Sequence, residues 1–187
     1  MYNFILEIIP PVITLLGRTL TKGGGGLITG TWIHLSFEDD SYTKENLCSI
    51  FKIYKLHDGF RMEGTTYYPN GVQKDTYTGD LCRLRGDVFE FFNSVLEEES
   101  EPVRVYGRYN FSRPNKVGIP SDFQGFYISS GTRASKVKRP VFGMRISRSF
   151  RKQHNINTNM DLISKAVPEI KRKFGMPEIA VDTEGVL

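Results

Sequence analysis

The feature that most constrains the fold is a series of strand signals separated by short turn signals. The segment "LITGTWIHLSF" alternates apolar and polar residues, and comparable segments recur at short intervals along the chain. Turn sequences such as "HDG", "PNG" and Gly86-Asp87 lie between them. No helical crossover separates the segments, so we expect an antiparallel sheet. The predicted strands cover residues 27–37, 46–56, 60–68, 75–86, 87–97, 102–112, 122–129 and 139–149.

About eight consecutive antiparallel strands is the number that closes a small up-and-down barrel. The interior of such a barrel holds side chains or one small ligand. Glycines within the strands fit a tightly curved sheet, because glycine allows strands to bend. The predicted class is therefore all-β, a small antiparallel eight-stranded up-and-down barrel with an N-terminal hydrophobic helix and a C-terminal helix. The strand glycines are Gly30, Gly64, Gly79, Gly107, Gly125 and Gly143.

The C-terminal helix is predicted from the segment "NTNMDLISKAVPEIKRKFG". It is expected to begin near Met160 with Asn159 as its N-cap and to end at Gly175. Pro168 lies inside this segment, so we expect it to shorten or kink the helix.

The first 22 residues are apolar from Phe4 to Leu16, apart from Glu7 and the Pro10-Pro11 pair. A membrane-spanning helix needs about 20 apolar residues, and this run is shorter. A partial transmembrane helix, a helix in the membrane interface and a helix packed on the barrel all remain open. We expect residues 1–22 to associate with a membrane, 23–26 to form a glycine linker, native or engineered, and 27–187 to form one ligand-sensing barrel domain with its C-terminal helix.

The charge pattern favours an anionic partner. Net charge is +4, and Lys and Arg are concentrated between Arg133 and Arg172. This indicates phosphates, nucleotides or lipid headgroups, with an ordinary solvated surface as the alternative. We do not expect a DNA or RNA partner.

Neither a catalytic nor a metal-binding pattern is present. The two cysteines and three histidines lack metal-ligand spacing, so we expect no metal and no cofactor. One disulfide is possible, but two free thiols fit better. The carboxylate run Glu97–Glu99 with Glu101 is typical of a solvated turn, and no nucleophile or phosphate-loop motif occurs. The sequence therefore favours a binding protein over an enzyme.

Three segments carry candidate binding chemistry. "GTWIHLSF" resembles the lipocalin opening, in which the tryptophan plugs one end of the barrel, so Trp32 is expected to be structural. In "VYGRYNFSR", Tyr109 and Arg108 are adjacent on one strand, so at most one of them lines the interior. The segment 127–147 combines hydroxyl groups and cations, which suits a phosphodiester. The predicted ligand-binding residues are Tyr77, Tyr109 and Tyr127 for stacking on bases, Arg108, Arg133 and Arg145 for phosphates, and Thr132 as a hydrogen-bond donor.

The order of parts resembles that of the two-transmembrane β-barrel effectors of bacterial cyclic-oligonucleotide antiphage defence. The shared features are the hydrophobic N-terminus, the short linker, the G-x-W opening and the motifs "YTG", "YGRY" and "FQGFY". The resemblance implies a cyclic dinucleotide receptor whose barrel controls oligomerisation and disruption of the bacterial inner membrane, with the barrel in the cytoplasm. It implies membrane lipid and further copies of the chain as partners.

This chain departs from that pattern because there is room for at most one short membrane helix before the glycines. The alternative function is a lipocalin-like binder of a small apolar ligand, which requires an uncharged cavity.

Overall fold

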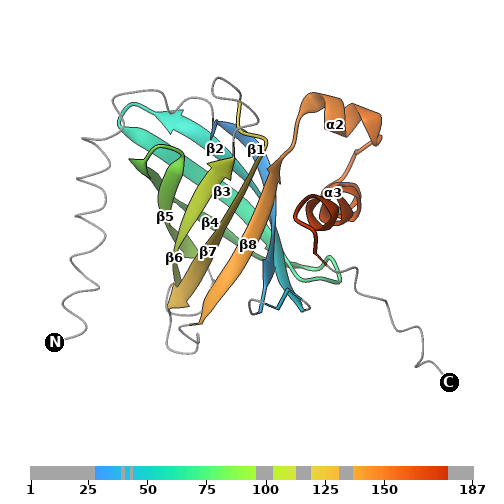
Figure 1. Ribbon diagram of the computed structural model, residues 1–187, viewed down its shortest axis with the longest axis horizontal. Coiled ribbons are helices and arrows are strands. Elements are labelled where there is room, and N and C mark those ends of the chain that lie inside the picture. The colour runs from blue at the N-terminus through green and yellow to red at the C-terminus, as the bar shows by residue number, and fades with distance from the viewer. Residues whose placement is uncertain are drawn as a thin grey trace.

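The computed structural model describes residues 28–38, 41–42, 44–95, 103–112, 119–130 and 137–176. Within these ranges eight strands form one closed barrel, in which each strand pairs with its neighbours in the sequence and β8 pairs with β1 (Figure 1). All pairings are antiparallel. The strands are β1 (Gly30–Phe37), β2 (Glu45–Leu56), β3 (Gly59–Tyr67), β4 (Gln73–Arg85), β5 (Val88–Val95), β6 (Arg104–Ser112), β7 (Asp122–Ser130) and β8 (Lys138–Arg145).

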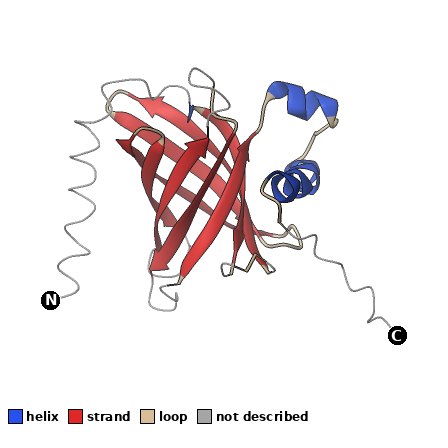
Figure 2. Ribbon diagram, in the orientation of Figure 1, coloured by secondary structure: helices blue, strands red, loops and turns tan. Residues whose placement is uncertain are grey.

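This topology confirms the predicted eight-stranded up-and-down barrel and its lipocalin-like architecture. Two helices follow the last strand, α2 (Arg148–Gln153) and α3 (Asn159–Lys173), and both lie on one side of the barrel (Figure 2). None of the helices in the described ranges is long and apolar enough to cross a membrane. The predicted membrane segment 1–22 and the linker 23–26 lie outside the described residues.

The sequence prediction was wrong about the end of the last strand. It extended that strand to Ser149, whereas β8 ends at Arg145 and α2 begins at Arg148. The physical reason is a helix cap: the Ser147 hydroxyl accepts a hydrogen bond of 3.0 Å from the backbone N–H of Phe150. The chain therefore turns into a helix where apolar alternation alone indicated a strand.

The N-cap of α3 was also assigned to the wrong residue. It is Thr158, not Asn159, because the Thr158 hydroxyl accepts from the Asp161 N–H and the Asp161 carboxylate accepts from the Thr158 N–H. The Asn159 side chain instead donates to the Tyr67 hydroxyl on β3. Pro168 does not shorten the helix, which continues to Lys173.

Alternation along each strand divides the apolar residues into two clusters. Inward-facing side chains fill the barrel, while outward-facing residues of β1 and β8 pack against α3. In β1 the even positions Trp32 and His34 face the interior, and the odd positions Ile33 and Leu35 face the helix. Strand β1 is consequently buried on both faces, and its polar residues His34 and Ser36 are buried as well.

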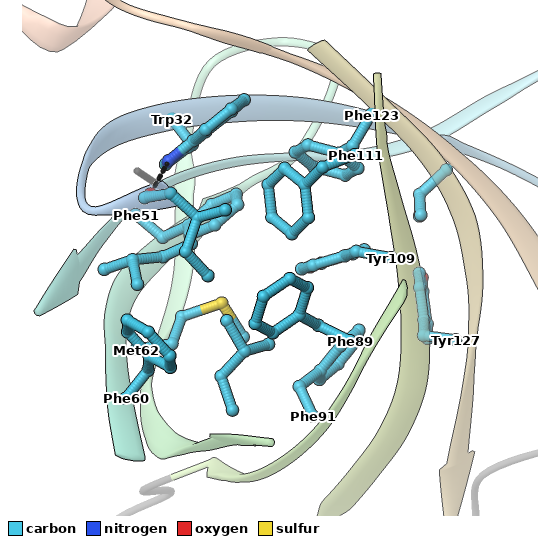
Figure 3. Close-up of a cluster of buried hydrophobic side chains, with 14 of the residues drawn as sticks. Trp32, Phe51, Phe60, Met62, Phe89, Phe91, Tyr109, Phe111, Phe123 and Tyr127 are labelled. Carbon is cyan, nitrogen blue, oxygen red and sulfur yellow. Dashed lines mark hydrogen bonds between the residues drawn. The ribbon is translucent and has the colours of Figure 1, made fainter. Parts of the chain in front are cut away.

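The interior near Trp32 is tightly packed with aromatic rings (Figure 3). Trp32 is fully buried, its ring centroid lies 5.0 Å from that of Phe111 and 5.6 Å from that of Phe123, and its indole N–H donates to the Ile28 carbonyl. Strand glycines make room for such rings. A Cβ on Gly143 would overlap the Phe123 ring, and a Cβ on Gly107 would overlap Phe91. Close approach is thus a second reason for glycine here, besides the predicted bending of the strands.

Candidate ligand-binding cavity

The barrel interior opens into a cavity of about 450 Å³ at the end opposite Trp32. Strands β1, β6 and β7 supply His34, Tyr109 and Tyr127 to its wall, and β4 supplies Tyr77. We call the end around Trp32 the closed end and the end with the cavity the open end. Cavities of about 300–1,000 Å³ are typical of small-molecule sites.

The apolar part of the wall comes mainly from β5 and β6. Phe91 lies close to Tyr109, with ring centroids 4.4 Å apart, and Tyr109 also packs on Phe123 at 4.3 Å. Tyr109 therefore lines the cavity and also contacts the packed aromatic rings of the closed end (Figure 3). The other apolar lining residues are Leu47, Val95, Val103 and Val105.

Uncharged polar groups are distributed between these apolar surfaces. His34 Nδ1 lies 3.2 Å from the Tyr109 hydroxyl, and the Ser49 and Thr66 hydroxyls are 3.2 Å apart. Burial lowers the pKa of His34 to about 3, so its imidazole is neutral and offers hydrogen bonds to the cavity but no charge. The remaining uncharged polar lining residues are Ser36, Tyr68, Asn93 and Ser129.

Two buried polar atoms in this wall have no hydrogen-bond partner among the described residues. They are the Tyr77 hydroxyl and Asn93 Oδ1. Burial raises the pKa of Tyr77 strongly, and the nearby Ser49 hydroxyl lowers it by a smaller amount. The Ser49 hydroxyl is nevertheless not in hydrogen-bond geometry with the Tyr77 hydroxyl. A buried polar group without a partner is costly, so both atoms are suitable partners for a ligand.

Among the described residues, charged groups line the cavity at three positions. Lys74 Nζ lies 2.9 Å from Asp75 Oδ2, so these two charges compensate each other. Arg139 is the third, and no hydrogen bond or ion pair joins it to another described residue. The net charge of the described lining is thus supplied by Arg139.

The three predicted stacking residues Tyr77, Tyr109 and Tyr127 all line this cavity. Two of the predicted arginines, Arg108 and Arg145, do not join them. Arg108 points to the outer surface, as strand alternation requires, and forms a 2.6 Å ion pair with Glu90, whose carboxylate also accepts from Tyr106 at 2.9 Å. The Arg108 guanidinium, which was expected to bind a phosphate, is therefore already paired with Glu90.

Arg145 faces the interior at the closed end, away from the cavity. Its guanidinium donates to the Thr29 carbonyl and lies over the Trp32 ring, with Cζ 5.7 Å from the ring centroid. Arg145 is thereby part of the closure around Trp32. Thr132 and Arg133 lie outside the described residues, in the segment that connects β7 to β8.

The sequence analysis did not select His34, Asn93 or Arg139 as site residues. Strand alternation would have found two of them, since His34 shares the face of Trp32 and Arg139 shares the face of Val141 and Arg145. Asn93 shares the inward face of Phe91 and Val95, but the apolar Phe92 beside it obscures the alternation in this strand.

No site for a metal stands out in the described part of the chain, where no group of three His, Cys, Asp or Glu residues is placed to hold an ion. Both cysteines are free thiols, Cys48 buried and Cys82 half-buried, so the disulfide alternative does not occur.

No protein-family model matches the sequence, and no curated protein matches it either. Among solved structures, the chain is similar to EF1p2_mFAP2b bound to DFHBI, with TM-score 0.47 and 12% identity over 64% of this chain and 94% of the other. It is also similar to mFAP1, a redesigned β-barrel bound to DFHBI, with TM-score 0.46 and 12% identity over 64% and 95%. The siderocalin Ex-FABP, described as functioning through dual ligand specificities, matches with TM-score 0.35 and 12% identity over 87% and 98%. With TM-scores below 0.5, these likenesses carry no functional argument.

Proposed function

We propose that this barrel is a binding protein for one small, largely apolar ligand that enters the cavity at the open end. The observation that carries the proposal is the contrast inside one barrel: aromatic rings fill the closed end, while about 450 Å³ remain open between Phe91, Tyr109 and Tyr127. Aromatic walls favour a flat ligand, because ring faces stack with little conformational loss.

The polar groups define further properties of this ligand. His34, Tyr77 and Asn93 present hydrogen-bonding atoms inside the cavity, so the ligand should carry at least one buried polar group. Arg139 supplies one cationic partner, which suits a ligand with a single carboxylate. A fully apolar ligand would leave these groups without partners. The alternative predicted from the sequence, a binder of a small apolar ligand, is therefore refined to a ligand that also carries a polar group.

The test is a thermal-shift panel of a planar aromatic carboxylic acid, its neutral amide, a fatty acid, haem and a cyclic dinucleotide. A ligand at a hundredfold excess over its Kd stabilises the folded state by about 2.7 kcal/mol. We expect the aromatic acid to raise the melting temperature most. Failure of every compound to shift it would contradict the proposal.

A matched pair of variants locates the binding site. Val105→Trp places a large ring in the cavity and should weaken binding at least about tenfold, whereas Asn110→Trp points outward from the same strand and should not. Equal affinities of the two variants would place binding elsewhere on the molecule.

A cyclic dinucleotide is a second candidate, favoured by the position of all three predicted stacking tyrosines in one cavity. Its two phosphates need two cations, and of the described lining cations Lys74 is already paired with Asp75. The panel separates the two candidates directly. The roles in antiphage defence, membrane disruption and oligomerisation, and the location at the inner membrane, remain proposals that depend on residues 1–22.

A further inference from the structure

The rim of the closed end combines exposed apolar side chains with cations. Leu56 in the β2–β3 hairpin is 42% exposed, Leu84 before the β4–β5 turn is 39% exposed, and Ile119 before β7 is 56% exposed. These three residues come from separate connections that all lie at the Trp32 end of the barrel. Exposed large apolar residues can contact an apolar partner, but Tyr68, Val72 and Val137 are exposed at the open end as well. The closed end is distinguished by the cations that accompany its apolar residues.

Cations alternate with these apolar residues. Lys55 and Arg85 flank Leu56 and Leu84 in the sequence, and both are exposed. Helix α2 begins three residues after the end of β8, at the same end of the barrel, and carries Arg148 and Lys152. The two are exposed, and no salt bridge or hydrogen bond joins either side chain to a described residue.

The carboxylates at this end do not balance the cations. Asp58 lies 3.8 Å from His57, Asp80 lies 3.9 Å from Arg61, Asp122 is paired with Lys173, and Asp87 is the fourth. The cations near the same rim are Lys55, Arg61, Arg83, Arg85, Arg148, Arg151 and Lys152. The excess of positive charge attracts an anionic surface.

The first described residues also lie at this end. Ile28 accepts the Trp32 indole hydrogen bond, and Thr29 accepts from Arg145. The apolar sequence between Phe4 and Leu16 precedes these residues by fewer than 25 positions. The described part of the chain therefore begins at the cationic end of the barrel.

We propose that the closed end is a docking face for an anionic lipid bilayer, with Leu56 and Leu84 in the interface and Arg148 and Lys152 on the headgroups. Leucines among cations are typical of interfacial lipid binding, whereas a nucleic-acid surface depends on cations alone for most of its affinity. The cavity then opens away from the membrane, where a ligand can enter while the barrel is docked.

The experiment is sedimentation of the full-length protein with vesicles of phosphatidylcholine and with vesicles that also contain phosphatidylserine. The measured quantity is the ratio of the two affinities, because residues 1–22 can contribute to both. We expect clear preference for the anionic vesicles. Arg148→Gln combined with Lys152→Gln should reduce that preference about thirtyfold, since each cation at an anionic surface contributes about 1 kcal/mol.

The matched control removes two cations from the open end, Lys44→Gln with Lys138→Gln, and should change the preference less than about threefold. Leu56→Ser should weaken binding to both vesicles, while Val72→Ser, in the exposed β3–β4 connection, should not.

Three results would overturn the proposal: equal affinity for both vesicle types, equal effects of the test and control pairs, or release of the protein from vesicles by mixed-sequence double-stranded DNA. Release by DNA would mean that the closed end binds polyanions in general and not lipid bilayers in particular. None of these results bears on ligand binding in the cavity.

Discussion

The two ends of the barrel are built from the same eight strands but differ in what their inward residues do. At the closed end, Trp32, Phe111 and Phe123 contact one another and leave the indole N–H bonded to the Ile28 carbonyl. At the open end, polar residues such as Ser49 and Asn93 replace aromatic rings, and a cavity remains. The difference is that one end of the barrel is filled by packed side chains, whereas the other end leaves space inside the barrel.

The largest expected effect comes from Trp32→Ala, which should break the closed end. Loss of a fully buried aromatic residue lowers the free energy of unfolding by about 3–5 kcal/mol. Val105→Ala, in the wall of the cavity, should lower it by about 1 kcal/mol or less, since the space beside it is already open. Urea denaturation of both variants measures the difference, and similar losses would contradict the assigned division of roles.

The two arginines on β8 allow the same comparison within one strand. Arg145→Leu removes a charged hydrogen bond to Thr29 and the contact with Trp32, and should cost about 1.5–3 kcal/mol of unfolding free energy. Arg139→Leu should change stability by less than about 0.5 kcal/mol but weaken binding of an aromatic carboxylate about tenfold. Calorimetry and urea denaturation are both needed. A stable Arg145→Leu protein would show that this arginine does not close the barrel.

His34 should make stability depend on pH. Its pKa is about 3 in the folded protein and near 6.5 when the chain is unfolded, so between these values the unfolded chain binds more protons. Stability is therefore fully present above the unfolded pKa and is lost as pH falls below it, by about 2 kcal/mol at about pH 5. Urea denaturation at neutral and mildly acidic pH measures the loss. The His34→Gln variant should lose this acid sensitivity, and an unchanged pH dependence would assign it to other groups.

The smallest expected effect concerns the hydroxyl pair in the cavity. Ser49→Ala with Thr66→Val removes both partners of one hydrogen bond, and such paired removal is nearly neutral, so stability should change by less than about 1 kcal/mol. Ligand affinity should fall more than stability does. A large loss of stability would mean that this part of the open end also supports the fold.

The structure also changes how the aromatic site can be tested. Tyr109 is fully buried against Phe91 and Phe123, so Tyr109→Ala removes core packing as well as a cavity wall. This packing makes Tyr109→Ala unsuitable as a probe that leaves the barrel folded. Val105→Trp avoids the problem because it fills space that the barrel does not use.

The number of strands, their antiparallel order and most of their boundaries followed from the sequence alone. Alternation is a local property, and short turns allow each strand to pair only with its neighbours, so "VYGRYNFS" already determined that Tyr109 and Arg108 point to opposite sides. Alternation also accounts for the three tyrosines of the cavity wall. Each lies two positions from a strand glycine and shares its inward face: Tyr77 with Gly79, Tyr109 with Gly107 and Tyr127 with Gly125.

The partners of the charged residues were decided only by the tertiary structure. Arg108 meets Glu90 from the neighbouring strand, Arg145 meets Thr29 from a segment 116 positions away, and Arg139 remains in the cavity wall. Alternation separates Arg108 from the other two, but nothing local distinguishes Arg139 from Arg145, which share one face of β8. Barrel closure by the pairing of β8 with β1 brings Arg145 to Trp32, because strand register and closure, not composition, determine which side chains become neighbours.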